Sequence, residues 1–434
     1  MPILFSDVTV VPMDGAPQVL EHAYVAVEGT KIASVGTEPP EGTFDRVVDG
    51  AGKVLLPGFV NAHTHLPMTL MRGYGGGCDL HTWLNQYIFP AEARLDSRAV
   101  AAGAGLGLAE MIASGVTCVA DMYMHTGTIA EQILEAGISA NLSCGGVYFG
   151  APEDFSPETC GDCRNQAALT EEWHGAGAGQ ILVDASVHGE YTSNPPLWRW
   201  MAEYAAEHRL GMHVHVSETQ SEHQASLERW GKTPIQALDG CGVWDCGRSL
   251  AAHCVYTTEE DWALMAEKGI SCVHNPWSNL KLGSGVAPIP AMMRAGVNVA
   301  LGTDGMSSHN SADLFSDIKL AAVLHNGVER DPMAVNAWAA LEMATVNGAR
   351  ALGRDTGVIA PGKTADLILV DLSAPNLIPC HDPVEDLVFS AHGSNVEMNM
   401  ARGQVIYEKG SFLTLDLERV HWEVEHYALP LIFG

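Results

Sequence analysis

The 434-residue chain has 52 acidic and 23 basic side chains, a formal net charge of -29, and hydrophobic residues make up 47% of it. This balance supports a large buried core and excludes a disordered chain, and the negative field argues against nucleic acid or a membrane surface as partners. We therefore expect a neutral, zwitterionic or cationic small-molecule substrate, although solubility alone also explains such a charge.

The first 57 residues alternate apolar and polar positions in short runs separated by turn residues, which predicts strands at 3–11, 24–29, 31–36 and 53–58. The opening MPILFSDVTVVPMDG lacks the basic region and long apolar run of a signal peptide, and no run reaches the length of a membrane span. Ten scattered cysteines fit reduced thiols. These features favour a cytoplasmic protein.

From residue 58 to 354, short apolar runs that end in polar residues alternate with helical stretches. Eight runs can be counted: GFVNAHTH, GVTCVADMYMH, GISANLSCGG, ILVDASVHG, LGMHVHVSE, SLAAHCV, GISCVHNP and NVALGTDG. Parallel strands joined by crossover helices produce this alternation, and eight repeats predict an α/β fold of the (β/α)8 TIM-like barrel type. The polar residues that end these runs would meet at one edge, where such barrels build their active sites.

After residue 354 the strand pattern of the N-terminal region returns in DLILVDL, NVEMNMARG and QVIYEKG. We expect residues 1–57 and 355–434 to form one small composite β-sandwich domain beside the barrel of residues 58–354. The apolar end HYALPLIFG can pack either on a second subunit, which would make a homo-oligomer, or on the chain's own barrel.

Two histidine motifs are the first candidates for metal binding. His63 and His65 are two residues apart in a predicted strand, so both point to one face and can bind one ion, although two incidental histidines would look the same. His215 ends a later strand, and His213 lies on the same face one pleat deeper, so His215 is the favoured ligand. Glu218 follows three residues later, either as a general acid/base or as a solvated loop residue.

Two further polar residues end apolar runs. Asp304 lies between glycines in LGTDG, where it is either a metal ligand that also accepts a proton from water or the N-cap of the next helix. His253, in AAHC, either orients that water or is a buried core histidine. Taken singly, neither residue decides between its two interpretations.

The combination is more specific. An HxH pair, a histidine with glutamate three residues later, a histidine and an aspartate, each at a predicted strand end, resemble the amidohydrolase superfamily in its branch of aromatic-base and nucleoside deaminases. The resemblance runs from PGFVNAHTHLPM through HVHVSET, AAHC and GTDG to GVIAPGKTADLILVDL. No lysine lies between the two histidine motifs, so the bridging lysine of binuclear members is absent. The resemblance implies one divalent ion, Zn²⁺ with Fe²⁺ or Mn²⁺ as alternatives, on His63, His65, His215 and Asp304.

The resemblance also implies a reaction, the hydrolytic deamination of a cyclic amidine. A metal ion lowers the pKa of bound water toward about 7. Asp304 would accept a proton from that water, His253 would hold the resulting hydroxide, and Glu218 would carry a proton to the ring nitrogen beside the attacked carbon. Ammonia leaves.

The substrate is indicated by the segment WLNQYIFPAE, which resembles deaminases of 5'-methylthioadenosine and S-adenosylhomocysteine. There, the residue matching Glu92 binds ribose hydroxyls, which suits a carboxylate acceptor, while a favourable position in a first helical turn is the alternative explanation. Trp83 would line the pocket, and His188 matches a histidine that contacts the nucleoside. His215 would face both metal and substrate.

Two departures from this family bear on the substrate. Cys144 stands near the position of an arginine that binds the carboxylate of S-adenosylhomocysteine, and only a loop residue such as Arg164 could replace that cation. His309 stands where asparagine is expected, next to Asn310. Adenosine, 5'-deoxyadenosine or 5'-methylthioadenosine is therefore expected, with S-adenosylhomocysteine left open. The alternatives are a deaminase or chlorohydrolase of a free guanine-like base, pterin or triazine, and a non-catalytic scaffold of the same fold.

Overall fold

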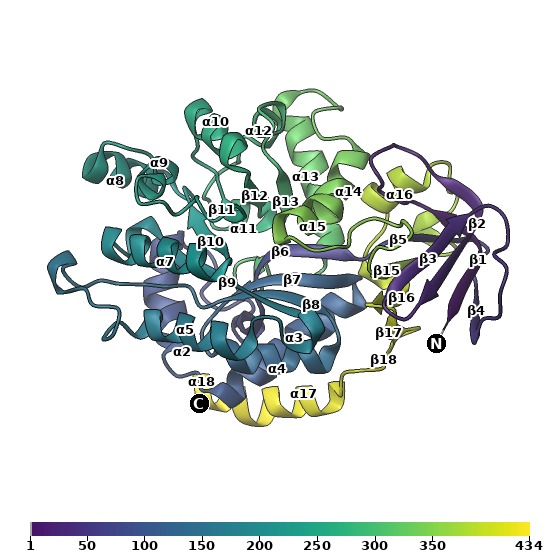
Figure 1. The fold of residues 1–434 in the computed structure, drawn as a ribbon, viewed down its shortest axis with the longest axis horizontal. Coiled ribbons are helices and arrows are strands. Elements are labelled where there is room, and N and C mark those ends of the chain that lie inside the picture. Colours follow the sequence, from purple (N-terminus) through teal and green to yellow (C-terminus); the bar gives the residue numbers. More distant parts are fainter. Residues whose placement is uncertain (1) are drawn as a thin grey trace.

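A nine-stranded parallel sheet forms the centre of the computed structural model, which describes residues 2–434 (Figure 1). In chain order its strands are β6 (Phe59–His65), β7 (Val116–Met122), β8 (Ser139–Ser143), β9 (Ile181–Gly189), β10 (Gly211–Val216), β11 (Ser249–His253), β12 (Ile270–His274), β13 (Val299–Leu301) and β14 (Asp304–Gly305). Each of the eight runs predicted as strands is present, the last as the two pieces β13 and β14.

The sheet closes on itself through these two pieces. β13 pairs in parallel with β12, whereas β14 pairs in parallel with β6, so the first and last strands meet. At that seam Asp304 lies opposite Thr64. The prediction of a TIM-like barrel is confirmed.

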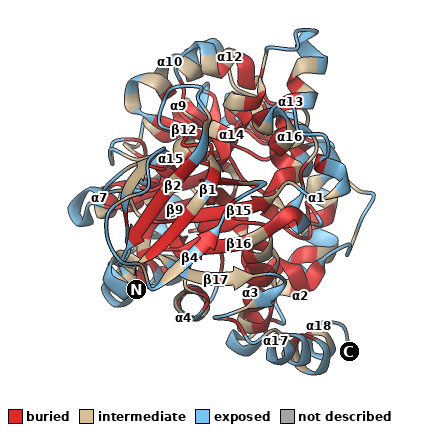
Figure 2. Ribbon diagram, turned by 90° about the vertical axis from the view of Figure 1, so that its right-hand side faces the viewer, coloured by how far each residue is buried: buried red, intermediate tan, exposed pale blue. Residues whose placement is uncertain are grey.

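Helices cover the outside of the barrel, and local capping signals begin them. α3 (Ser97–Ala113) starts at Asp96, whose side chain accepts a hydrogen bond from the Ala99 amide. α10 (Glu259–Lys268) starts with a capping box of Thr258 and Asp261. Other helices on the outside of the barrel include α4 (Thr126–Ala136), α7 (Pro195–His208) and α13 (Leu314–Glu329) (Figure 1). Figure 2 shows buried residues along the strands and exposed residues on the outer helix faces.

Strands from both ends of the chain form a second sheet. Its order is β18-β17-β16-β15-β5-β1-β2-β3, with β4 (Arg46–Asp49) added beside β1. Its remaining strands are β1 (Ile3–Val10), β2 (Leu20–Glu28), β3 (Lys31–Gly36), β5 (Lys53–Pro57), β15 (Leu367–Asp371), β16 (Val396–Ala401), β17 (Gln404–Glu408) and β18 (Ser411–Phe412). β5 and β15 pair antiparallel and join the two ends. The sequence pattern did not predict β4 or β18.

The C-terminal tail continues past this sheet as α17 (Leu417–Glu423), a π-helical turn η7 (Val424–Ala428) and α18 (Leu429–Phe433), and it lies along the barrel helices (Figure 1). Arg98 of α3 forms an ion pair of 2.8 Å with Glu423, and Arg94 donates to the Ile432 carbonyl at 2.5 Å. The apolar end therefore covers the barrel of its own chain. Within residues 2–434, no helix has both the length and the apolar character needed to cross a membrane.

Candidate active site

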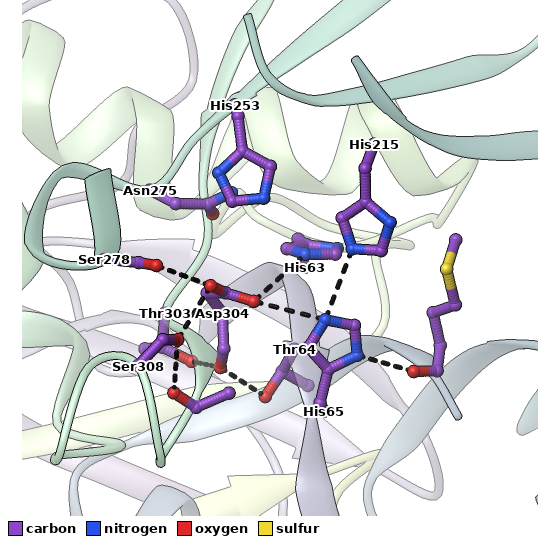
Figure 3. Close-up of polar contacts among 12 residues, drawn as sticks. His63, Thr64, His65, His215, His253, Asn275, Ser278, Thr303, Asp304 and Ser308 are labelled. Atoms are coloured by element: carbon purple, nitrogen blue, oxygen red, sulfur yellow. Dashed lines mark hydrogen bonds and ion pairs between the residues drawn. The ribbon is translucent and has the colours of Figure 1, made fainter. Parts of the chain in front are cut away.

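Four predicted ligands meet at the carboxyl end of the barrel strands (Figure 3). The Nε2 atoms of His63 and His65 lie 3.4 and 3.2 Å from Oδ1 of Asp304. Nε2 of His215 lies 3.3 Å from Nε2 of His65. Strands β6, β10 and β14, which are far apart in the sequence, thus bring these groups together. Their ligand atoms form two overlapping sets, each within 4.8 Å, which are His63, His65 and Asp304, and His63, His215 and His253.

The other ring nitrogen of each histidine is held by a neighbour. Nδ1 of His65 donates to the Met122 carbonyl at 2.5 Å, and Nδ1 of His215 donates to the His188 carbonyl at 2.7 Å. Nδ1 of His63 lies 2.8 Å from Nε2 of His213. These contacts fix the ring orientations and leave the Nε2 lone pairs free for a metal ion.

The chemistry of this cluster fits a divalent cation. Nε2 of His63 is buried and has no hydrogen-bond partner, which is costly unless an ion uses its lone pair. Burial lowers the pKa of His63 to about 3 and holds that of His215 well below its usual value, so both rings are neutral, as metal ligands must be. Against the effect of burial, the Asp304 carboxylate raises the pKa of His65 to about 9, so a metal ion on this ring would take the place of a proton. Three imidazoles and one carboxylate form a donor set typical of zinc.

The carboxylate of Asp304 is directed by two serine hydroxyls. Ser278 and Ser308 donate to its Oδ2 at 2.6 and 2.8 Å, which leaves Oδ1 facing the histidines. Burial alone would raise the pKa of Asp304, but the imidazoles of His63 and His65 outweigh it and hold the pKa well below its usual value. Asp304 is therefore ionised, and its backbone adopts a left-handed φ of 60° rather than beginning the next long helix, which Asp313 caps.

His253 and Glu218 face each other beside this cluster. Nε2 of His253 lies 3.8 Å from a carboxylate oxygen of Glu218, and Nδ1 of His253 lies 2.8 Å from the side-chain oxygen of Asn279. Glu218 is 5% exposed, which contradicts the interpretation as a solvated loop residue. Burial raises the pKa of Glu218, so the protonated form that a general acid needs is favoured.

Glu222 is a neighbour of Glu218 that the sequence analysis missed. Its two carboxylate oxygens accept hydrogen bonds from the backbone amides of Ser217 and Glu218, both at 2.7 Å. A capping-box pattern, Thr219 followed by Glu222, was visible in the sequence, but such a pattern predicts a contact to Thr219. The observed contacts instead fix the backbone that carries Glu218.

The cluster opens into a cavity of about 440 Å³ that also contains the other predicted substrate contacts, which are Trp83, Glu92 and His188. The Tyr123 hydroxyl donates to Oε1 of Glu92 at 2.6 Å, and burial raises the pKa of that carboxyl. Tyr123, which follows β7 directly, was also missed. The cavity is large enough for a small molecule, and its wall combines apolar side chains with a few polar groups.

Of the positions at which the sequence departs from the deaminase pattern, Cys144 lies in the cavity wall and His309 does not. Cys144 lines the cavity, whereas Arg164 is exposed and donates to the Glu158 carbonyl at 3.0 Å. His309 is buried and lies 2.8 Å from a carboxylate oxygen of Asp317. Asn310 receives a hydrogen bond from Lys281. The wall of the cavity, as far as residues 2–434 form it, includes no lysine or arginine.

Comparison with known proteins agrees with this geometry. The sequence profile described as "Amidohydrolase family" matches residues 54–406. A 5-methylthioadenosine/S-adenosylhomocysteine deaminase from Caldanaerobacter subterraneus subsp. tengcongensis is 41% identical over 436 residues, covering 100% of this chain and 99% of that protein. A 5'-deoxyadenosine deaminase from Methanothermobacter thermautotrophicus is 40% identical over 412 residues, covering 95% of each. The crystal structure of an adenosine deaminase from Xanthomonas campestris with bound zinc superimposes with a TM-score of 0.92 at 32% identity, covering 99% of this chain and 98% of that one.

Proposed function

The chain belongs to the amidohydrolase family, and we propose that it is a metal-dependent deaminase that converts adenosine or a 5'-modified adenosine into the inosine product and ammonia. The observation that carries the proposal is that Glu218 and Glu92 line one cavity together with His65, His215 and Asp304, behind which His63 lies within reach of the same ligand groups. The names of similar proteins, which include 5-methylthioadenosine/S-adenosylhomocysteine deaminase and 5'-deoxyadenosine deaminase, support the same substrate class.

His63, His65, His215 and Asp304 would hold one divalent ion, which we propose to be Zn²⁺. Such an ion lowers the pKa of water toward about 7, so that a nucleophile is present at neutral pH. The zinc in the similar Xanthomonas campestris structure supports this choice over Fe²⁺ or Mn²⁺.

The proton transfers fall to this chain's own residues. Asp304 accepts a proton from the attacking water, because its Oδ1 faces the histidines while its Oδ2 is held by serines. Glu218 delivers a proton to the ring nitrogen beside the attacked carbon, for which its raised pKa suits it. His253 orients the water through Nε2, since Asn279 holds Nδ1.

The nucleoside is recognised beside this centre. Oε1 of Glu92 receives the Tyr123 hydroxyl, and its other oxygen can accept a ribose hydroxyl. Trp83 lines the same cavity, where it offers an apolar wall. His188 and His215 border the base, with ring centroids 4.7 Å apart. A free base has no ribose diol, so Glu92 separates the nucleoside substrates from a guanine-like base, pterin or triazine.

Ultraviolet absorbance of the zinc-loaded protein with a substrate panel tests the proposal. The panel holds adenosine, 5'-deoxyadenosine, 5'-methylthioadenosine, S-adenosylhomocysteine, guanine and a pterin, with ammonia release as a second readout. We expect the adenosines to become inosines. Glu92→Ala should lower kcat/KM for them by roughly 10- to 100-fold, because Glu92 loses its hydrogen bonds with a ribose hydroxyl and with Tyr123. Turnover of a free base alone, or full activity of Glu92→Ala, would overturn the nucleoside assignment.

We also propose a division of the chain into two units, residues 58–354 as the barrel and residues 1–57 with 355–434 as a small β-sandwich domain. The pairing of β5 with β15 supports a composite unit, since it joins the two chain ends. A buried cluster that includes Phe5, Leu55 and Met400 gives this unit a core of its own.

A further inference from the structure

One part of the cavity wall has no role in the chemistry described above. It consists of the loop of residues 144–149, which follows β8, and the start of α5 (Gly161–Trp173). The Val147 amide donates to Oδ2 of Asp162 at 2.8 Å, which ties loop and helix together. Val147 and the 79% exposed Phe149 give this region an apolar surface.

This region begins beside the metal centre and extends away from it. The ring of His188 lies 4.7 Å from that of His215, centroid to centroid. A Cβ placed on Gly145 would meet His188 at 3.9 Å, so the loop starts against that histidine. For a nucleoside whose base lies at the metal and whose ribose lies at Glu92, this wall is the remaining part of the cavity lining that offers a charged side chain to the 5' substituent.

This wall offers a 5' substituent one carboxylate and no basic side chain. Four carboxylates line the cavity within residues 2–434. Roles have been proposed for three of them, metal binding for Asp304, proton transfer for Glu218 and ribose binding for Glu92, and Asp162 is the fourth. The same wall includes no lysine or arginine, and Arg164 is directed to the Glu158 carbonyl. An anionic substituent would thus meet a negative charge and no compensating cation.

The Asp162 carboxylate is partly buried and has two protein donors. Burial raises the pKa of its carboxyl, while the donors Val147 and Asn165 favour the ionised form. Its protein donors are a backbone amide at 2.8 Å and a side-chain amide at 3.4 Å, so lone pairs remain for a ligand. A partly desolvated carboxylate that is not neutralised by a protein cation attracts an ammonium group more strongly than a solvated one does.

We propose that Asp162 selects the 5' substituent, favouring a short apolar chain that ends in a cation and disfavouring one that ends in a carboxylate. The apolar surface of Val147 and Phe149 would cover the chain, and the Asp162 carboxylate would receive the ammonium. The proposal rests on the deaminase function proposed above. It adds that the subsite discriminates by charge, through repulsion of anions as well as attraction of cations.

Three 5'-thioethers of matched length test this inference: 5'-(2-aminoethylthio)-, 5'-propylthio- and 5'-(carboxymethylthio)-5'-deoxyadenosine. kcat/KM is measured at pH 7 with the zinc-loaded full chain, beside adenosine. We expect the order amine, neutral, carboxylate, with at least a tenfold difference between the two ends of the series. In Asp162→Asn the ratio of amine to carboxylate should fall to within about threefold, since the amide keeps an acceptor for Val147 but not the charge.

The ratio is taken within one preparation, so a lower folded fraction of a variant cancels. Asp154→Asn is the matched control, because it removes the same charge from an exposed residue nearby and should leave the ratio unchanged. Equal kcat/KM for the three thioethers, or a ratio that persists in Asp162→Asn or falls equally in Asp154→Asn, would overturn the assignment while deamination stands. Absence of turnover for every adenosine would overturn the proposed function and, with it, this inference.

Discussion

Glu222 offers the sharpest test of how Glu218, the proposed general acid, is positioned. Its two carboxylate oxygens accept the amides of Ser217 and Glu218, both at 2.7 Å, in a buried position. Ser217 has a left-handed φ of 51°, a conformation that costs free energy unless neighbouring contacts maintain it. We expect Glu222→Gln to leave the ligands in place but to loosen the backbone that carries Glu218.

The size of the effect follows from the hydrogen bonds. Glutamine keeps one acceptor oxygen and turns an amide group toward the other backbone N–H, so one buried donor is left unpaired. An unpaired buried donor costs about 1–3 kcal/mol. If that cost falls on the transition state, kcat decreases by roughly 5- to 150-fold. KM should change little, because Glu222 does not line the cavity.

The assay compares kcat and KM for adenosine, together with bound zinc and thermal stability. Glu228→Gln is the matched control, since this residue lies on the same helix, α8 (Gln220–Trp230), and is exposed. The control should behave as the unaltered protein does. A kcat of Glu222→Gln within twofold of the unaltered value, with zinc retained, would refute the idea that this carboxylate positions Glu218. A loss of zinc in parallel with kcat would assign the effect to the metal centre instead.

Three other predictions follow from the same geometry. Glu218→Gln should keep its zinc, measured by atomic absorption, but lose roughly 10²- to 10⁴-fold in kcat, and near-normal turnover would remove Glu218 from proton transfer. His213→Phe should weaken zinc binding about 10- to 100-fold in a chelator competition, because His63 loses its 2.8 Å partner, and unchanged affinity would contradict this. Burial lowers the pKa of His325 from 6.5 to about 4, so the unfolded chain binds its proton first, and the free energy of unfolding should fall as the pH drops from about 6.5 to about 4. Urea titrations should show a smaller fall for His325→Gln, and an identical fall would refute the assignment.

The sequence predicted most of the barrel because strand and helix periods alternate strongly there. All eight runs became barrel strands, and the residues that end them lie at one edge. The same rule located His63, Asp304 and the other proposed ligands, since a parallel strand sends its terminal side chain to the mouth regardless of distance along the chain. These predictions required no knowledge of side-chain contacts.

The residues that were missed act through contacts that no pattern encodes. The sequence pattern predicts that Glu222 caps a helix, and only the fold shows that its carboxylate accepts hydrogen bonds from the amides of residues 217 and 218. In the sequence Tyr123 is simply an aromatic residue after a predicted strand, yet its hydroxyl donates a hydrogen bond to Glu92, 31 positions earlier. Asp162 is one charged residue in a polar stretch of the sequence, and only the structure shows that it lies in the first turn of α5 and lines the cavity. Contacts of this kind, whether local or long-range, depend on loop conformation, which hydrophobic periodicity does not determine.

The position of the metal cluster follows from how the barrel closes. β14 pairs with β6 so that Asp304 lies opposite Thr64, and Thr64 donates to the Asp304 carbonyl at 3.1 Å. Residues on either side of Thr64 are His63 and His65, so this register places the carboxylate between two imidazoles. Alternation along the strands alone would send the Asp304 side chain to the face of Thr64, but its left-handed φ of 60° departs from strand geometry, and its Oδ1 lies 3.4 and 3.2 Å from the Nε2 atoms of the two histidines. His63 and His65 lie on one side of the seam between the first and last strands and Asp304 on the other, so a divalent ion held by these residues would favour the closed barrel over any state in which the seam is open.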